Sequence, residues 1–184
     1  MIAIIVVGVI LLLVVVYLIA TYNSFISMRN MVQEAFSTMD VYLKKRYDLI
    51  PNIVETVKGY AKHESSTLES VVAARNNAMS AQTNEETLAA QGELQQTLGR
   101  LFALAESYPD LKANTNFMDL QQQLSTIESE IAQSRKYYNG TVRAFNTKVE
   151  SFPSNIVAGM FKFVRQALYE VDNVEERQNV KVEF

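Results

Sequence analysis

His63 is the single histidine of the sequence, so it is the first residue to consider as a metal ligand or general base. It lies in the segment KHESS, which lacks the second histidine that a helical HExxH zinc motif requires. A di-metal carboxylate site in a helical bundle uses Glu-x-x-His pairs, but Tyr60 occupies the position three residues before His63. We therefore expect His63 to be exposed or to cap a helix, with no metal bound.

Other catalytic chemistry has no matching pattern in the sequence. The chain has no cysteine, which excludes disulfides, thiolate nucleophiles and iron–sulfur clusters. It contains neither a Gly-x-Ser-x-Gly elbow that would present a serine nucleophile nor a glycine-rich phosphate loop. We therefore predict a non-enzymatic protein that binds no cofactor, and an unrecognised hydrolase is the least favoured function.

The charged residues also limit the classes of partner. The net charge is −3 and the basic residues are scattered, so the sequence predicts no positively charged surface that would attract the phosphates of a nucleic acid. Nucleic acid is therefore not an expected partner. One basic run, Lys44, Lys45 and Arg46, could bind anionic lipid if it lay at a membrane surface. Whether it can do so depends on how far from the membrane the predicted helices place it.

The first element is an uncharged stretch, Ile2 to Ala20, with the sequence IAIIVVGVILLLVVVYLIA. As a helix it would be roughly 29 Å long, about the thickness of a bilayer core. A cleaved signal peptide would need a basic start, a shorter apolar core and small residues before the cut, and these are missing. We predict a transmembrane anchor at residues 1–21, with Tyr17 and Tyr22 at the interfaces.

The orientation of this anchor follows from the positive-inside rule. No Lys or Arg precedes the stretch, whereas Arg29 and then the basic run follow it. Cytoplasmic flanks carry the excess of Lys and Arg, so the rule favours a cytoplasmic domain after the anchor.

Apolar residues then recur in steps of three and four, the spacing of amphipathic helices. No helix breaker separates Ala20 from the first stripe, so we expect the anchor to continue into it as one helix. Pro51 should kink or restart this helix, after which the stripe runs on to Ser80. The predicted core residues of this half are Phe25, Met28, Val32, Ala35, Met39, Tyr42, Ile53, Val57, Tyr60, Leu68, Val71 and Val72.

The second half shows the same periodicity. A turn is expected at Gln82 to Glu85, a loop at Ser107 to Asn116, and a final short helix at Asn155 to Glu170, with Asn116 as the N-cap of the longest helix. The expected core residues are Leu88, Leu94, Leu98, Leu101, Phe102, Ala105, Phe117, Leu120, Leu124, Ile127, Ile131, Ser134, Tyr138, Thr141, Phe145 and Phe152, with Met28, Met31, Met39 and Met118 as core filling.

These helices predict an all-α fold, in which the N-terminal transmembrane helix continues into a long antiparallel helical bundle. We expect a helical bundle domain at residues 22–172 and a polar C-terminal tail at residues 173–184.

This architecture places the basic run far from the bilayer. A continuous helix from Ala20 puts Lys44 roughly 36 Å from the membrane, several times the Debye length of about 8 Å. A solvated face or a partner contact is therefore favoured over lipid binding. Arg46 continues the stripe of Met39 and Tyr42, so we expect it to pair with a carboxylate that faces the core.

Two long segments resemble the LemA family of bacterial membrane proteins. The first is Tyr22 to Arg75, which contains KRYDLIPN and VKGYA, and the second is Glu106 to Pro153, which contains YPDL. One departure is Phe36, where the family often has tryptophan. The resemblance implies a short extracytoplasmic N-terminus, one membrane span and a helical bundle in the bacterial cell membrane. Some members are magnetosome-associated and others are encoded near membrane proteases, which implies membrane organisation or an adaptor role, without catalytic residues.

Two functions follow as hypotheses. The first is a helical scaffold, held to membrane lipid by its N-terminal helix, that self-assembles as a homo-oligomer and organises partners at the bacterial membrane. The second is an adaptor that binds a membrane protease or sensor protein without self-assembly. The candidate partner surface consists of the basic run and the exposed part of the loop, namely Lys44, Lys45, Arg46, Tyr108, Pro109 and Asp110.

Overall fold

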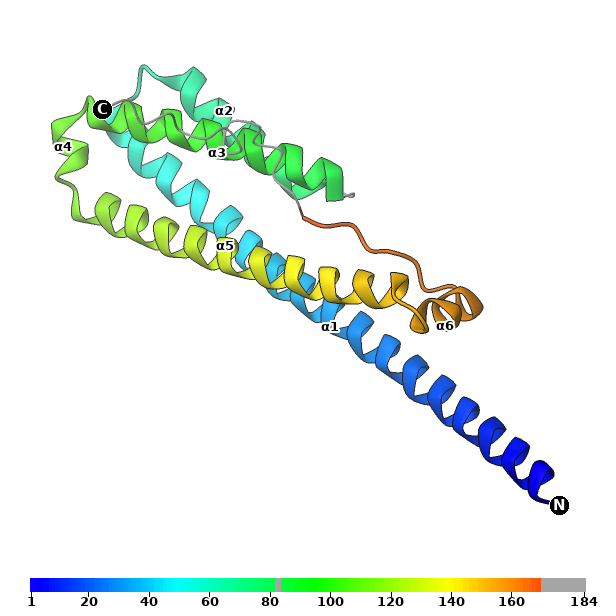
Figure 1. Cartoon of the computed structure of the whole chain (residues 1–184). Coiled ribbons are helices and arrows are strands. Elements are labelled where there is room, and N and C mark those ends of the chain that lie inside the picture. Colours follow the sequence, from blue (N-terminus) through cyan, green and yellow to red (C-terminus); the bar gives the residue numbers. More distant parts are fainter. Residues whose placement is uncertain (82–83, 170–184) are drawn as a thin grey trace, which may run out of the picture. The chain divides into compact units, whose positions relative to one another are not determined.

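A computed structural model describes residues 1–81 and 84–169 of the chain, and every regular element in these ranges is an α-helix. The helices, shown in Figure 1, are α1 (Ile2–Tyr60), α2 (Ser65–Ser80), α3 (Asn84–Glu106), α4 (Pro109–Lys112), α5 (Thr115–Glu150) and α6 (Ser154–Phe161). The predicted all-α fold, with a long apolar N-terminal helix that continues into packed helices, is confirmed. The predicted tail at 173–184 lies outside the described residues.

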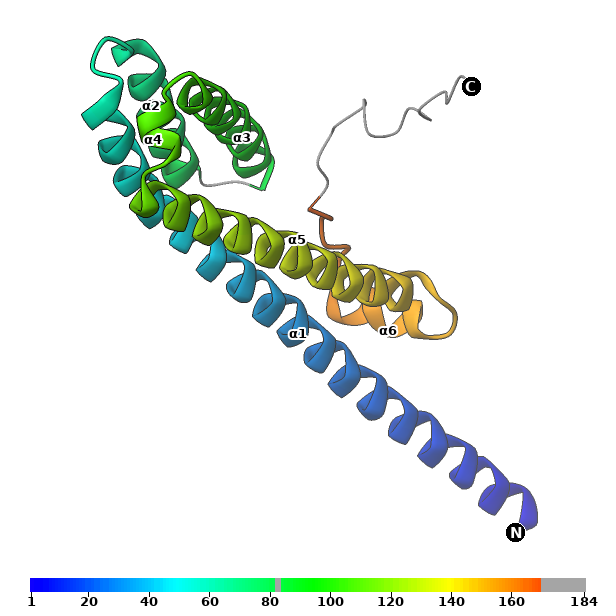
Figure 2. The same ribbon diagram turned by 90° about the vertical axis from the view of Figure 1, so that its left-hand side faces the viewer.

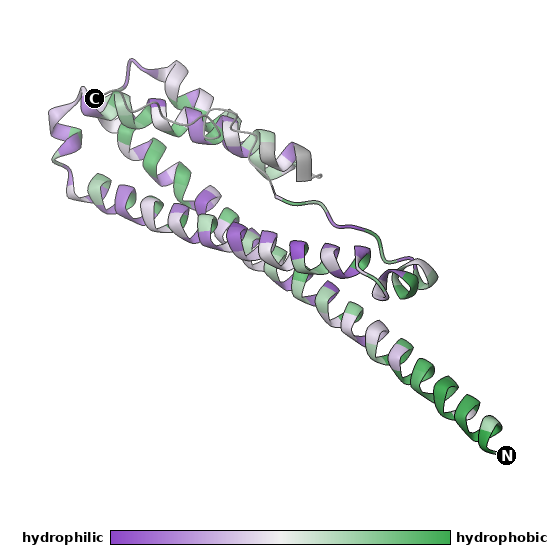
Figure 3. Ribbon diagram, viewed as in Figure 1, coloured by the Kyte–Doolittle hydropathy of each residue, from purple (hydrophilic) through white to green (hydrophobic). Residues whose placement is uncertain are grey.

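Helix α1 runs without interruption from the apolar N-terminal stretch into the amphipathic stripe, as predicted. In Figure 3 the ribbon of the N-terminal part of this helix has mainly the green of hydrophobic residues. Within the described ranges, α1 is the one helix that is long and apolar enough to cross a membrane. Its most apolar window has no buried residue, so this stretch packs against nothing in the fold.

The described chain forms two compact units, and both long helices contribute to each of them. Unit 1 consists of Met1–Leu43 and Glu128–Leu168, which include the first part of α1, the second part of α5, and α6. Unit 2 consists of Lys44–Ile127 and Tyr169 among the described residues, and includes the end of α1, helices α2 to α4 and the start of α5.

Unit 1 is built from two antiparallel helical segments with aromatic rings between them. Phe25 of α1 is fully buried and lies 6.0 Å from Phe145 of α5, centroid to centroid. Farther along, Phe36 of α1 lies 5.8 Å from Tyr138 of α5. The predicted stripe is confirmed by the buried side chains of Phe25, Val32, Ala35, Met39, Ile131, Ser134, Tyr138 and Phe145.

Unit 2 has a mainly aliphatic core in which α2 packs against α3 and α3 contacts α4. Its predicted core residues that prove buried are Ile53, Val57, Leu68, Val71, Leu94, Leu98, Leu101, Ala105, Phe117 and Leu124. The short α4 begins with Pro109 in its first turn, a position where the missing backbone N–H costs no helical hydrogen bond. The turn predicted at Gln82 to Glu85 falls partly outside the described residues, and α3 already begins at Asn84.

Several predicted helix boundaries are wrong. The chain leaves the helix between Tyr60 and Ser65, where one continuous stripe was expected. The predicted loop at Ser107 to Asn116 contains α4, and α5 starts before Asn116. The last helix stops at Phe161 rather than Glu170, because Lys162 adopts a left-handed conformation with φ of 57° and its N–H bonds back to the last turn.

Some residues that were predicted to fill the core are exposed instead. They are Met31, Tyr60, Val72, Met118 and Phe152, with exposed fractions between 39% for Val72 and 81% for Phe152. The physical reason is clearest for Phe152: α5 ends at Glu150, so the helical spacing that would have placed this ring on the buried face no longer applies. The side chain of Leu88 lies outside the described part.

Pro51 lies inside α1 and does not end it. A proline lacks the N–H that would bond to the carbonyl four residues earlier, which here is that of Tyr47. Arg75 of α2 replaces this donor, since its Nε donates to the Tyr47 carbonyl oxygen at 2.7 Å. The helix therefore continues past Pro51 while its orphaned carbonyl is satisfied from a neighbouring helix.

Candidate functional site

Arg46 of the predicted partner surface lies inside unit 2, with 3% of its surface exposed. Its two terminal nitrogens donate to carboxamide oxygens on α3, Nη1 to Gln91 Oε1 at 2.8 Å and Nη2 to Gln95 Oε1 at 2.7 Å. The prediction that Arg46 faces the core is confirmed. Glutamine side chains of α3 therefore bind these two nitrogens, and the expected pairing of Arg46 with a carboxylate stays a prediction.

Tyr47 extends this group of buried polar side chains. The Gln91 amide donates to the Tyr47 hydroxyl, and that hydroxyl donates to the Ala78 carbonyl oxygen of α2 at 3.3 Å. We call Arg46, Tyr47, Gln91 and Gln95 the buried polar cluster; its first three members are buried, and Gln95 lies at its exposed edge. Because its hydrogen bonds join α1 to both α2 and α3, the cluster fixes how these three helices meet inside unit 2.

Lys44 and Lys45 are exposed on α1 directly beside the buried Arg46. On α4, Pro109 and Asp110 are also exposed, and Tyr108 is half-buried. The basic run therefore does not act as one charged surface, because its third member faces the core.

The two parts of the predicted partner surface also lie apart. Asn114, just after α4, donates to the hydroxyl of Tyr60 at 2.9 Å, which ties this region to the end of α1. Lys44 precedes Tyr60 on the same helix by about 24 Å at about 1.5 Å per residue. A partner that contacts both Lys44 and Asp110 must therefore be extended.

A shallow groove of about 620 Å³ lies along unit 1 between α1 and α5. We call it the α1–α5 groove, and it is lined by Met31, Gln133, Lys136, Tyr137, Gly140, Thr141 and Ala144. Met31 and Tyr137 are 44% and 49% exposed there. A side chain added at Gly140 would meet no atom within 4 Å, so the backbone of α5 is open to an approaching surface.

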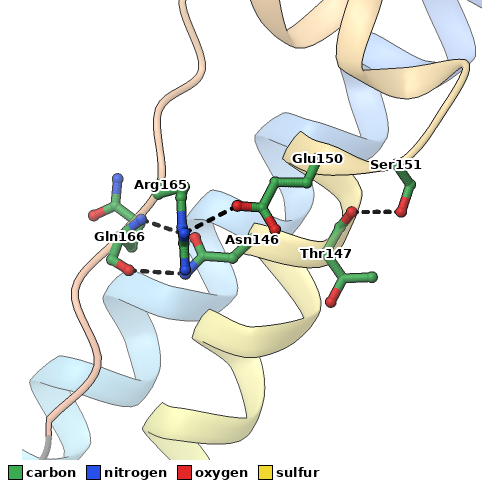
Figure 4. Close-up of polar contacts among 6 residues, drawn as sticks. All are labelled: Asn146, Thr147, Glu150, Ser151, Arg165 and Gln166. Carbon is green, nitrogen blue, oxygen red and sulfur yellow. Dashed lines mark hydrogen bonds and ion pairs between the residues drawn. The ribbon is translucent and has the colours of Figure 1, made fainter.

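The chain after α6 is held against α5 in unit 1 by directed polar contacts (Figure 4). The Asn146 side chain donates to the Gln166 carbonyl oxygen at 2.9 Å and accepts from the Gln166 N–H at 2.8 Å. Arg165 forms an ion pair with Glu150 at 3.1 Å. This pairing fixes the position of α6, which lies between the two attached segments.

His63 is exposed in the break between α1 and α2, as predicted. Over the described ranges, no group of three or more His, Asp or Glu side chains could hold a metal ion.

The fold first defines the class of protein: an all-α protein whose N-terminal helix starts with an exposed apolar stretch and continues into two packed units. Residues 35–184 match the LemA family. The chain therefore belongs to the LemA family, and the resemblance seen in the sequence is confirmed.

Individual relatives are distant. The chain is 24% identical over 154 residues to Protein LemA of Metamycoplasma hominis, a match that covers 83% of this chain and 70% of the relative. It is 26% identical over 179 residues to Magnetosome protein MamQ 2 of Paramagnetospirillum magneticum and 24% identical over 174 residues to Magnetosome protein MamQ of Magnetospirillum gryphiswaldense. These matches cover 83% and 80% of this chain, and the chain spans 66% and 64% of the two magnetosome relatives.

Sequence reasoning missed the surfaces that the fold creates between elements. Nothing in the sequence singled out the buried Gln91, since glutamine is polar and common on exposed helix faces. The α1–α5 groove pairs Met31 with residues about a hundred positions later, so no local pattern marks it.

Proposed function

We propose that this protein is a membrane-anchored, non-enzymatic scaffold that self-assembles through the α1–α5 groove and organises partner proteins at the bacterial membrane. The observation that carries the proposal is the open face of unit 1, where an apolar groove accompanies an exposed membrane-length helix. Membership of the LemA family and the likeness to relatives named magnetosome proteins support a membrane-associated role.

The anchor is supported by the exposure of the N-terminal stretch of α1. Its side chains from Ile2 to Val16 are about half exposed or more, and none is covered by another element. Exposing this large apolar surface to water is unfavourable, whereas lipid chains would cover it. The helix also satisfies its own backbone hydrogen bonds, as a segment inside a bilayer must.

Self-assembly is supported by the composition of the groove. Methionine and tyrosine are enriched at protein interfaces, and Gly140 and Ala144 allow a second backbone to come close. Copies held in one membrane share a common height and direction, so the same groove of two copies can meet face to face in a symmetric contact. We therefore assign a second copy of this chain as the occupant of the groove.

The proposal is tested by the mass of the full chain in mild detergent, measured by light scattering. The wild type should form an oligomer, and Gly140→Gln should reduce it to the monomer because the longer side chain fills the groove. The matched control is Gly99→Gln on α3, which also meets no atom within 4 Å and should keep the oligomer. A monomeric wild type, or equal masses for both variants, would reject assembly through this groove.

The soluble part is proposed to face the cytoplasm, because Arg29 lies close after the apolar stretch. A cysteine introduced by Ser80→Cys, at an exposed position, should resist a membrane-impermeant maleimide in intact cells and react after lysis. The chain has no native cysteine, so any label belongs to this site. Labelling in intact cells would show that the soluble part faces the outside of the cytoplasmic membrane, and would reject the proposed orientation.

An adaptor function is the alternative, and a second groove favours it. This groove of about 630 Å³ in unit 2 has apolar walls from Val54, Leu68 and Val72, with Glu55, Lys58 and Lys62 along it. It suits an amphipathic helix of another protein. A monomeric wild type that still captures a membrane protease or sensor would support this function over the scaffold.

A further inference from the structure

Helix α6 is apolar on both of its faces. Its sequence, SNIVAGMF, has no charged residue. One face is buried through Val157 and Ala158, while Ile156 and Met160 on the other face are 54% and 61% exposed. A helix at a water-exposed surface normally carries polar residues on its outer face, so the outer face of α6 is unusual for contact with water.

The exposed apolar surface extends beyond the helix on both sides. Phe152, in the turn before α6, is 81% exposed, and Phe161 and Val164 at its other end are 49% and 66% exposed. We call Phe152, Ile156, Met160, Phe161 and Val164 the apolar foot. Figure 3 shows α6 as a hydrophobic segment of unit 1, separate from the apolar start of α1. Large apolar side chains exposed together along one short segment point to an interaction surface.

Contacts inside unit 1 fix the height of this foot along α1. The Tyr22 ring of α1 lies 4.6 Å from the Phe161 ring and 5.9 Å from the Phe163 ring, centroid to centroid. Lys148, near the end of α5, donates to the Ser24 hydroxyl of α1. These contacts are made by Tyr22 and Ser24, which lie just after Ala20, where the apolar stretch ends. Helix α6 lies beside this part of α1 in Figures 1 and 2.

Basic side chains border the foot. Lys162 follows α6 directly and is exposed, and the Arg165 side chain is 68% exposed although it pairs with Glu150. An apolar face with Lys and Arg at its edge is typical of segments that lie in the boundary between lipid headgroups and acyl chains. Long basic side chains can there reach the phosphate groups while the apolar side chains enter the bilayer.

We propose that the apolar foot inserts into the surface of the same lipid bilayer that holds the N-terminal stretch of α1. The inference rests on the membrane anchor of the proposed function, but it adds a second and separate attachment. One helix alone could rotate about its axis and tilt, whereas a helix and a foot beside it set which side of unit 1 faces the membrane. The foot thereby fixes the direction in which the α1–α5 groove is presented.

The test uses tryptophan fluorescence, because the natural chain has no tryptophan. Single-tryptophan variants of the full chain are reconstituted in phosphatidylcholine and phosphatidylglycerol vesicles, with or without phosphatidylcholine brominated in its acyl chains. Phe152→Trp reports on the foot, Tyr17→Trp on the anchor, and Phe36→Trp, farther along α1 in unit 1, on a position away from the bilayer. Each substitution exchanges aromatic residues at a position at least 37% exposed, which leaves room for the larger ring.

Brominated lipid should quench Tyr17→Trp and Phe152→Trp and leave Phe36→Trp unchanged. Met160→Trp should be quenched like Phe152→Trp, which guards against a local effect of one substitution. If Tyr17→Trp is quenched and the two foot variants are not, the anchor stands and the foot is rejected. Blue-shifted emission of Phe152→Trp without quenching would mean that protein covers the foot, which also rejects it. No quenching of Tyr17→Trp would reject the anchor and the foot together.

Discussion

In unit 1 the space between α1 and α5 is filled by aromatic rings, whereas unit 2 encloses an arginine and a glutamine in an aliphatic core. Phe25 stacks on Phe163 at 4.7 Å and meets Phe145 edge-on. Arg46 in unit 2 instead forms directed hydrogen bonds of 2.8 and 2.7 Å. Ring packing favours close contact but tolerates small shifts, while hydrogen bonds to a buried guanidinium specify one arrangement.

Each of the two units is therefore held together by different interactions. In unit 1 the aromatic cluster holds the end of α5 and α6 against α1, beside the apolar stretch. In unit 2 the buried polar cluster sets the register of α1 against α2 and α3, and Arg75 supports it by satisfying the Tyr47 carbonyl. Stability should therefore depend on apolar volume in unit 1 and on particular donors in unit 2.

The largest expected effect is that of Phe25→Ala. This ring is fully buried between Phe145 and Phe163, and its removal should lower the free energy of unfolding by about 3–5 kcal/mol. The matched control is Phe36→Ala, a ring that is 37% exposed and should lose about 1 kcal/mol. Urea unfolding of the detergent-solubilised chain, followed by far-ultraviolet circular dichroism, measures both. Equal losses would mean that unit 1 does not depend on its aromatic cluster.

Arg46→Met should produce the next largest loss, about 3 kcal/mol. Two glutamine oxygens lose a charged donor, and each such hydrogen bond contributes about 1.5–3 kcal/mol. Arg46→Lys keeps the charge but loses the forked geometry, so its loss should be intermediate. Lys44→Met, at an exposed position on the same helix, should change the free energy of unfolding by less than about 0.5 kcal/mol. If Arg46→Met matched Lys44→Met, the polar cluster would add nothing to unit 2.

A double-mutant cycle tests the interaction between Arg75 and the helix at Pro51. Arg75→Leu alone removes the side-chain donor to the Tyr47 carbonyl oxygen and should cost about 1–3 kcal/mol. In the Pro51→Ala background the new N–H can bond to this carbonyl, so the same change should cost about 1 kcal/mol less. Strictly additive losses in urea unfolding would show that Arg75 does not compensate for the proline.

The apolar spacing predicted the long helices and most of the core because burial of one face determines the three-and-four pattern. It also predicted that Arg46 faces inward. Its partners could not be predicted, since the buried Gln91 has the same residue type as exposed glutamines elsewhere, such as Gln96 and Gln133. The predicted partner surface at Tyr108, Pro109 and Asp110 remains a hypothesis, and the foot was missed because it depends on where α5 ends.

Helix ends were predicted least well, because backbone conformation rather than apolar spacing determines them. The break after Tyr60 leaves the stripe nearly in register, so Leu68 and Val71 remain buried although the helix has restarted. Lys162 ends α6 in a left-handed conformation without a glycine to signal it. The prediction of Asn116 as the N-cap of the longest helix is wrong, because α5 begins at Thr115 and the capping oxygen is that of Asn114.

The smallest expected effect distinguishes these two asparagines. The Asn114 Oδ1 accepts from the Phe117 N–H at 3.0 Å, which is the hydrogen bond of an N-cap, so Asn114→Ala should cost about 1 kcal/mol. Asn116 lies in the first turn and is exposed, so Asn116→Ala should be neutral or slightly stabilising because alanine has the higher helix propensity.

Asn114 also donates to the Tyr60 hydroxyl, and a third variant separates this contact from the cap. Tyr60→Phe removes the hydroxyl that accepts from Asn114 and leaves the capping oxygen of Asn114 in place. If the cap is responsible, Tyr60→Phe should keep the wild-type stability in urea unfolding. If Tyr60→Phe is destabilised as far as Asn114→Ala, the hydrogen bond between Asn114 and the end of α1 is responsible, and the stability of unit 2 at this end would come from a side-chain bond between separate elements, as it does at Arg46.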